Sequence, residues 1–170
     1  MKVTGVLEVK GSGYGFVRCE NRDVYISSSM MNGAVHGQTV EAETELLVWG
    51  EAGGRITRIL SPYPEMVGSV YRAYRKIYVH PINRRYPDIS IPDGKTMDAC
   101  SGDKVVVSVS GTVGESSMLE GSITEILGKK KDPGIDCIAV ARSYGLKADF
   151  PKAAEKYANA STSEWFLATL

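Results

Sequence analysis

Three aromatic side chains near the start of the chain have the spacing of an exposed stacking surface. In the run Gly13–Arg18, Tyr14, Phe16 and Arg18 alternate with small or aliphatic residues, so in a strand they would share one face. Tyr25 follows in a second short run. Unpaired nucleic-acid bases stack on such rings for roughly 1–3 kcal/mol per base, with little dependence on sequence. The expected chemistry is therefore base stacking, with Arg18 holding a phosphate.

The second run, Asp23–Ser27, supports this arrangement. Val24 and Ile26 alternate with Tyr25 and suit the interior of a small barrel, which leaves Tyr25 and Ser27 on the outer face with the other rings. Exposed aromatics on one face cost solvation free energy unless something covers them. Unpaired bases are one possible cover, and the second half of the chain packing against the rings is the alternative.

The first sixty residues indicate an all-β domain, because short runs with period-two alternation are separated by Gly and Asn. Five short strands in so few residues fit a small closed barrel better than a sandwich. The expected strands are Val3–Val9, Gly15–Arg18, Val24–Ser27, Thr39–Glu45 and Gly54–Leu60.

The same layout then repeats after a break at Ser61–Pro64. The endings Gly54–Leu60 and Gly121–Leu127 share the pattern Gly-x-Ile-Thr-x-Ile-Leu, which indicates a duplicated barrel. The expected second set of strands is Met66–Tyr74, Lys76–His80, Asp88–Ile91, Lys104–Ser110 and Leu119–Leu127. We therefore expect a first barrel over residues 1–62, a second over 63–128 and a short helical segment over 129–170.

The helical segment has recognisable start and stop signals. Asp132 followed by Pro133 predicts a capped helix start, and Gly145 fits the stop. Lys152–Ala160 is a second, shorter helical stretch. Four residues in the first stretch fall at helical spacing: Ile135, Ile138, Ala139 and Arg142.

Further candidate ligands for nucleic acid lie in the second half. Lys76, Tyr78 and His80 would share the outer face of one strand, and Arg84 and Arg85 add local positive charge. Phosphate contacts are plausible chemistry for these cations. The alternative, which the sequence leaves equally open, is that these cations form a basic face that contacts only solvent.

Composition sets limits on these ideas. Lys plus Arg and Asp plus Glu are equal at 20 each, so nucleic-acid binding must come from local patches and stacking rather than from net charge. The amino-terminal residues contain no apolar signal region, and no apolar run approaches the length of a membrane span. Three scattered cysteines without metal-ligand spacing fit reduced thiols. We expect a cytoplasmic protein with no membrane contact.

The ordered pair Gly-Tyr-Gly-Phe-Val-Arg and Val-Tyr-Ile resembles the two ribonucleoprotein motifs of cold-shock domains. Two positions depart from that pattern. Ser12 stands where these domains usually carry Lys, and Ser27 stands where they usually carry His. Both changes remove hydrogen-bond donors, so the resemblance implies modest affinity for this barrel alone.

A wider resemblance covers residues 3–158. The runs Gly13–Arg18, Asp23–Ser27, Gly121–Gly128 and Asp132–Asp136 are similar to the N-terminal region of the ribonuclease R / ribonuclease II family of bacterial exoribonucleases. In that family two tandem cold-shock barrels of the oligonucleotide-binding (OB) fold precede a magnesium-dependent catalytic domain that degrades RNA from its 3′ end. The resemblance implies an all-β fold and single-stranded RNA as the partner.

The family's cluster of metal-holding aspartates has no counterpart here, because the aspartates of this chain are scattered. We therefore expect no catalytic residues and no metal site, with magnesium belonging only to the full-length family, and we expect no hydrolysis by this chain alone. Other expected partners are a separate catalytic domain or ribosome-associated RNA. Two further functions stay open, a free-standing RNA chaperone of cold-shock type and an OB module that binds proteins. RNA-binding residues are expected at Tyr14, Phe16, Arg18, Tyr25, Ser27, Lys76, Tyr78, Arg84 and Arg85.

Overall fold

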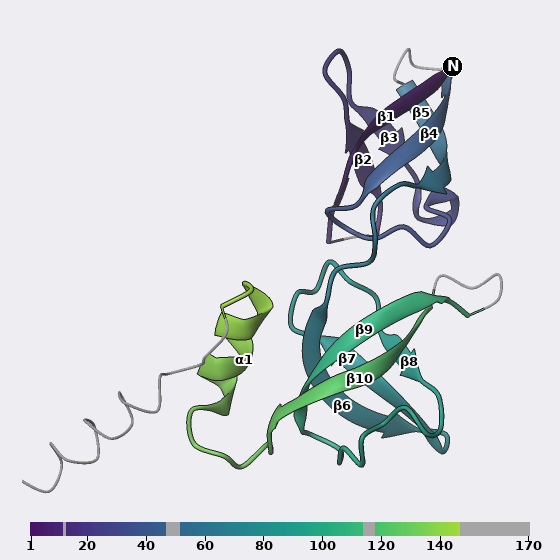
Figure 1. The fold of residues 1–170 in the computed structure, drawn as a ribbon. Coiled ribbons are helices and arrows are strands. Elements are labelled where there is room, and N and C mark those ends of the chain that lie inside the picture. Colours follow the sequence, from purple (N-terminus) through teal and green to yellow (C-terminus); the bar gives the residue numbers. More distant parts are fainter. Residues whose placement is uncertain (12, 47–51, 114–117, 147–170) are drawn as a thin grey trace, which may run out of the picture.

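The computed structural model describes residues 1–11, 13–46, 52–113 and 118–146 (Figure 1). The predicted helical stretch Lys152–Ala160 and the motif position Ser12 lie outside these residues. The described part is almost entirely β, as expected. Its elements are β1 (Lys2–Val9), β2 (Gly15–Arg18), β3 (Val24–Ile26), the 3₁₀ turn η1 (Ser28–Met30), β4 (Thr39–Leu46), β5 (Ala52–Ile59), β6 (Met66–Ala73), β7 (Lys76–Pro81), β8 (Ile89–Ile91), β9 (Lys104–Thr112), β10 (Leu119–Gly128) and α1 (Ile135–Ser143).

The first five strands form one closed sheet in the order β1-β2-β3-β5-β4. β1 pairs antiparallel with both β2 and β4, and the β1–β4 pairing closes the sheet. The one parallel pairing in this sheet among the described residues joins β3 to β5. Closure removes the unpaired strand edges that would otherwise invite association.

The second five strands repeat this topology, with β6 in the place of β1 and β10 in the place of β5. β6 pairs antiparallel with β7 and β9, and β8 pairs parallel with β10. The repeat extends to a close backbone crossing. A Cβ on Gly5 of β1 would lie 2.2 Å from the carbonyl oxygen of Arg18, and one on Gly68 of β6 would lie 2.5 Å from that of His80. Only glycine fits at these two equivalent positions.

Each closed sheet has its own apolar core, formed by the side chains that alternate inward. In the first, these include Leu7, Val17, Val24, Ile26, Val40 and Ile56. In the second, they include Val70, Val79, Ile89, Val105, Val107 and Leu119. The inward set on β2 and β3 is the one predicted from the alternation.

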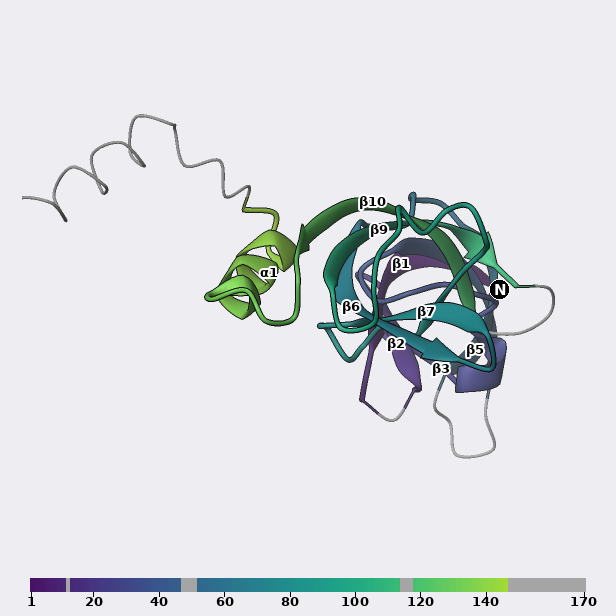
Figure 2. The ribbon, with the colours of Figure 1, turned by 90° about the horizontal axis from the view of Figure 1, so that it is seen from below.

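The loop between η1 and β4 packs against the second barrel and holds the two barrels together. Val35 belongs to this loop of the first barrel, yet its side chain is 2% exposed and packs in the core cluster of the second. Gln38, 1% exposed, accepts a hydrogen bond from the Val35 amide (2.8 Å) and donates one to the carbonyl of Ser61 in the connector (3.2 Å). Tyr63 donates its hydroxyl proton to the carbonyl of Gly33 (3.0 Å). Figures 1 and 2 show the resulting arrangement, with the barrels stacked one above the other.

The helix α1 packs beside the second barrel (Figure 2). Ala139 is buried against Val67 and Val106, and Arg142 pairs with Glu65 (3.3 Å) and Glu125 (3.4 Å). Ile138, predicted to lie on the same stripe, is exposed instead. No helix in the described part of the chain is long and apolar enough to cross a membrane.

One end of this helix was predicted correctly and the other was not. Gly145 (φ 77°) ends it as expected, because the amides of Gly145 and Leu146 donate to the carbonyls of Arg142 and Ala141. The predicted Asp132 cap is wrong. Its carboxylate accepts the Lys129 amide (2.7 Å) in the preceding turn, and the left-handed Gly134 occupies the cap position.

The contact between Gly33 and the second barrel gives a stability test. Gly33→Ala places a side chain at φ 77° with its Cβ 2.5 Å from Cγ2 of Thr112 on β9. Gly37→Ala is a matched control, because φ is 87° there and no atom lies within 4 Å. We expect the free energy of unfolding to fall by about 1–2 kcal/mol for Gly37→Ala and by about 1–3 kcal/mol more for Gly33→Ala, measured by urea denaturation.

Adding Thr112→Ala should abolish the difference between the two glycine variants, because it removes the methyl group that clashes with the Cβ of Gly33→Ala. Equal effects of Gly33→Ala and Gly37→Ala would show that the second barrel does not lie against Gly33.

Candidate nucleic-acid interface

Tyr14, Phe16 and Tyr25 form one aromatic cluster on the outside of the first barrel. The ring centroids of Tyr14 and Phe16 are 5.9 Å apart, those of Tyr14 and Tyr25 are 5.7 Å apart, and those of Phe16 and Tyr25 are 5.8 Å apart. All three residues are half-buried. Among the described residues, these rings contact one another and no ring of the second barrel.

The barrel fixes where these rings lie. Phe16 on β2 and Tyr25 on β3 are directly paired across the two strands. Tyr14 precedes β2 in a turn where Gly13 adopts φ 85° and donates its amide to the carbonyl of Lys10 (3.0 Å). The strand pairing and this turn therefore bring together three rings from two separate sequence runs, as predicted.

A charged cluster lies beside the rings. Glu8 accepts hydrogen bonds from Lys10 and from Nε of Arg18 (2.7 Å), and Arg18 also pairs with Asp23. The hydrogen bonds from Lys10 and then Arg18 lower the pKa of Glu8 to about 2, and the two carboxylates raise that of Arg18. The Arg18 guanidinium carbon lies 6.0 Å from the Phe16 ring centroid. Arg18 is thus held at the aromatic cluster, but it already has two carboxylate partners.

Ser27 lies where the aromatic face meets η1. Its hydroxyl is 3.1 Å from that of Ser29, and its carbonyl accepts the Met30 amide (2.9 Å). A small recess of about 240 Å³ opens here, and Tyr25, Ser27, Met30 and Arg55 are among its lining residues. Met30 is 43% exposed at this point, a flexible apolar side chain beside the rings.

The second barrel carries a separate aromatic pair. Tyr78 on β7 is stacked on Tyr71 of β6, with ring centroids 5.4 Å apart and an interplanar angle of 22°. The Tyr71 hydroxyl donates to Asp88 (2.7 Å), whose other oxygen lies 2.7 Å from Nδ1 of His80. Burial, and then the bond to Asp88, raise the pKa of Tyr71 to about 12. Lys76 is exposed at the start of the same strand.

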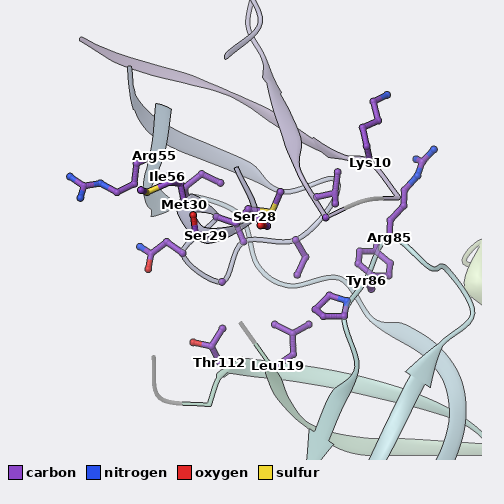
Figure 3. A pocket seen from close by; sticks show the side chains of 18 of the residues that line it. Lys10, Ser28, Ser29, Met30, Arg55, Ile56, Arg85, Tyr86, Thr112 and Leu119 are labelled. Atoms are coloured by element: carbon purple, nitrogen blue, oxygen red, sulfur yellow. The ribbon is translucent and has the colours of Figure 1, made fainter. Parts of the chain in front are cut away.

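The remaining predicted residues, Arg84 and Arg85, are not part of either aromatic group. They lie in the exposed loop between β7 and β8, and both line a cavity between the barrels. Figure 3 shows Arg85 at this cavity. The structure thus divides the predicted residues among three places, and it leaves their roles as predictions.

The sequence predictions missed several residues that accompany the predicted ones. Tyr71 is one, although the hairpin itself could have revealed it, because the two-residue turn at Tyr74 and Arg75 places Tyr71 opposite Tyr78. Met30 and Arg55 are others. They give no local signal, because only the closure of the barrel brings β5 beside η1.

The family resemblance assigns magnesium to the catalytic domain of the full-length proteins and not to this part of the chain. Within residues 1–11, 13–46, 52–113 and 118–146, no group of three or more His, Cys, Asp or Glu side chains could hold a metal ion.

The charged cluster predicts a pH-dependent stability. The pKa of Glu8 is lowered in the folded chain from 4.5 to about 2, so its stabilising contribution is present above pH 4.5 and is lost as the pH falls toward 2. Glu8→Gln should therefore lower the urea midpoint most above pH 4.5, with the difference from wild type shrinking as the pH falls. Glu20→Gln, which removes an exposed carboxylate outside the cluster, is the control. A pH-independent difference would contradict this assignment.

The comparisons with known proteins agree with this architecture. Residues 5–55 match the family described as Ribonuclease B OB domain, and residues 78–151 match the family described as Cold shock domain. Ribonuclease R of Escherichia coli (strain K12) is 31% identical over 159 residues, covering 91% of this chain and 20% of that protein. The chain thus spans about a fifth of the length of this relative.

Solved structures show the same fold. The structures of Mycoplasma genitalium RNase R, in its apo form and in complex with ribose methylated single-stranded RNA, each align with a TM-score of 0.74 at 18% identity, covering 93% of this chain and 26% of that one. Yeast Ssd1, described as a pseudonuclease, aligns with a TM-score of 0.67 at 18% identity, covering 84% of this chain and 24% of that one. In sequence and in fold, the chain is therefore similar to the N-terminal OB region of ribonuclease R.

Proposed function

We propose that this chain binds single-stranded RNA on the Tyr14–Phe16–Tyr25 cluster, as the substrate-gripping part of a ribonuclease R-like 3′-to-5′ exoribonuclease. Both closed sheets are then tandem barrels of the cold-shock type. The observation that carries the proposal is the cluster itself, in which three half-buried rings from β2, β3 and the preceding turn lie within 6 Å of one another on the outer face.

The geometry suits stacking without sequence readout. The interplanar angles between the three rings range from 36° to 84°, so the rings offer differently tilted surfaces to bases of a flexible single strand. Every base has a flat face to stack. The zero net charge of the chain favours stacking over a general electrostatic field as the main source of affinity.

Arg18 acts as a phosphate ligand in this proposal only by exchanging a carboxylate for a phosphate. Its bonds to Glu8 and Asp23 are exposed ion pairs, which contribute little because water and salt screen them. A phosphate oxygen near the rings can therefore replace one of them at small cost.

Related proteins support the choice of ligand. The RNase R structure that shares this fold was solved with single-stranded RNA. We assign RNA cleavage, and the magnesium it needs, to the catalytic part of a complete ribonuclease R-like protein, with this chain holding the strand. We further propose a cytoplasmic location, a compartment in which three cysteines that form no disulfide with one another stay reduced.

The stacking role can be tested by alanine substitution. Tyr25→Ala and Phe16→Ala should each weaken binding of a labelled oligouridylate about tenfold, measured by fluorescence anisotropy, because each loses roughly 1–3 kcal/mol of stacking per base. Tyr144→Ala removes an exposed tyrosine beyond α1 and should leave affinity unchanged. The dependence on salt should keep its slope in all three variants, since no charge is altered.

Failure of the wild-type chain to bind the oligouridylate at low salt would rule out RNA binding and favour an OB module that binds proteins. Equal losses in Tyr25→Ala and Tyr144→Ala would move the site away from the cluster.

The binding role also predicts no hydrolysis. Incubation of the chain with end-labelled RNA and magnesium should leave the RNA at full length, because this chain holds the strand and the metal chemistry is assigned elsewhere. Release of mononucleotides, absent from a buffer-only control, would contradict this prediction.

A further inference from the structure

A large cavity lies between the two barrels. Its volume is about 1010 Å³, at the upper end of the range of roughly 300–1,000 Å³ that ligand pockets have. Ser28, Ser29 and Met30 of the first barrel line it, and Thr112 and Leu119 of the second barrel face them (Figure 3). A space of this size holds at least one whole nucleotide.

The cavity has a marked charge bias. Four cationic residues line it, namely Lys10, Arg55, Arg84 and Arg85, and none of its described lining residues is Asp or Glu. The whole chain carries as many acidic as basic residues, so this bias is local. Figure 3 shows Arg55 at one end of the cavity, and Lys10 and Arg85 at the other.

Two of these cations are available to an anionic ligand. Lys10 pairs with Glu8, and Arg55 lies 3.7 Å from Glu43. Arg84 and Arg85 are exposed, and no carboxylate in the described part of the chain lies within ion-pair distance of either.

His36 lies next to Arg85 and, like Arg85, has an N–H group that needs a hydrogen-bond acceptor. His36 accepts the Val9 amide at Nδ1 (3.2 Å), so the proton of its neutral ring sits on Nε2. Nη1 of Arg85 lies 2.9 Å from that Nε2. Burial, and then Arg85, lower the pKa of His36, which keeps the ring neutral. Two proton donors therefore face each other across the barrel interface, and an oxygen acceptor, such as a phosphate oxygen, would satisfy both.

The cavity adjoins the recess beside the aromatic cluster. Tyr25 lines the smaller recess, and two residues, Met30 and Arg55, line both the recess and the cavity. Unlike the described lining of the cavity, that of the recess includes a carboxylate, Glu45. The surface from Tyr25 over Met30 to the cationic cavity therefore offers a strand a short path that does not cross the barrel.

We propose that a single strand of RNA continues from the aromatic cluster past Met30 into the inter-barrel cavity, where Arg84 and Arg85 hold its phosphates. This inference rests on the proposed function and adds a second segment to the same binding path. The chain then binds more nucleotides than one aromatic cluster can stack, and the second barrel contributes through its loop between β7 and β8, not through the Tyr71–Tyr78 pair.

Oligonucleotides of two lengths distinguish binding at the aromatic cluster alone from binding that extends into the cavity. Oligouridylates of about four and about twelve nucleotides, within the range of about 4–16 that one OB barrel spans, are titrated against the whole 170-residue chain by fluorescence anisotropy. The variant Arg84→Gln/Arg85→Gln removes two charges from exposed loop positions. The control Arg72→Gln/Lys95→Gln removes two charges from exposed positions that do not line either space.

The longer strand should bind the Arg84→Gln/Arg85→Gln variant about tenfold more weakly than wild type, and its salt slope should fall by about 1.4, which is about 0.7 for each lost phosphate contact. The shorter strand should bind wild type and variant alike. The control pair should affect both lengths equally and weakly.

Ser29→Glu gives an independent check, since it places a carboxylate in the cavity without touching either arginine. It should weaken the longer strand only. If both cavity variants bind the longer strand as tightly as wild type does, the inference is overturned and the aromatic site is left intact. The same follows if the control pair loses as much affinity for the longer strand as the Arg84→Gln/Arg85→Gln variant. Failure of wild type to bind either length would instead remove the proposed function.

Discussion

The narrow interior of a five-stranded closed sheet is the constraint on which the rest of this structure depends. Such a barrel has room for one layer of side chains, so every inward position on β2 and β3 must be small or aliphatic. Gly15, Val17, Val24 and Ile26 fill those positions and are buried. The aromatic residues that alternate with them are therefore forced outward, and strand pairing then gathers them into one cluster.

The chain has no net charge, yet the region between the barrels is cationic. On the aromatic face, Glu8 and Asp23 offset Lys10 and Arg18. Between the barrels, the described lining contains cations and no carboxylate. The cationic region thus lies apart from the rings, so in the proposed RNA complex stacking and charge would be two separable sources of affinity. The zero net charge of the chain also limits nonspecific attraction for other anions.

Local patterns predicted most of the fold because alternation, turn residues and the internal repeat are all short-range signals. The strand Gly15–Arg18 was predicted to the residue, and the Gly145 stop signal was also correct. Asp132 was misread because a turn and a helix start compete for the same carboxylate, and the left-handed Gly134 places the helix start beyond it.

The contacts of the candidate site were harder to predict, since they depend on strands that are distant in sequence. Glu8 reaches Arg18 because β1 and β2 are paired. Arg55 reaches Met30 through barrel closure. His36 and Arg85 meet only because the barrels stack, and they are 49 positions apart in the chain. A pattern read along the sequence does not contain the distance between such residues.

The buried Gln38 has a mechanical consequence. Its side-chain amide links the loop between η1 and β4 to Ser61 in the connector, and Val35 from that loop is anchored in the core of the other barrel. Rotation about the connector is therefore restricted, because turning one barrel against the other would break the hydrogen bonds of Gln38 and pull the Val35 side chain out of the second core. In the proposed RNA complex, a pull on the strand at the first barrel would therefore be transmitted to the second barrel, because these contacts hold the two barrels in one relative orientation.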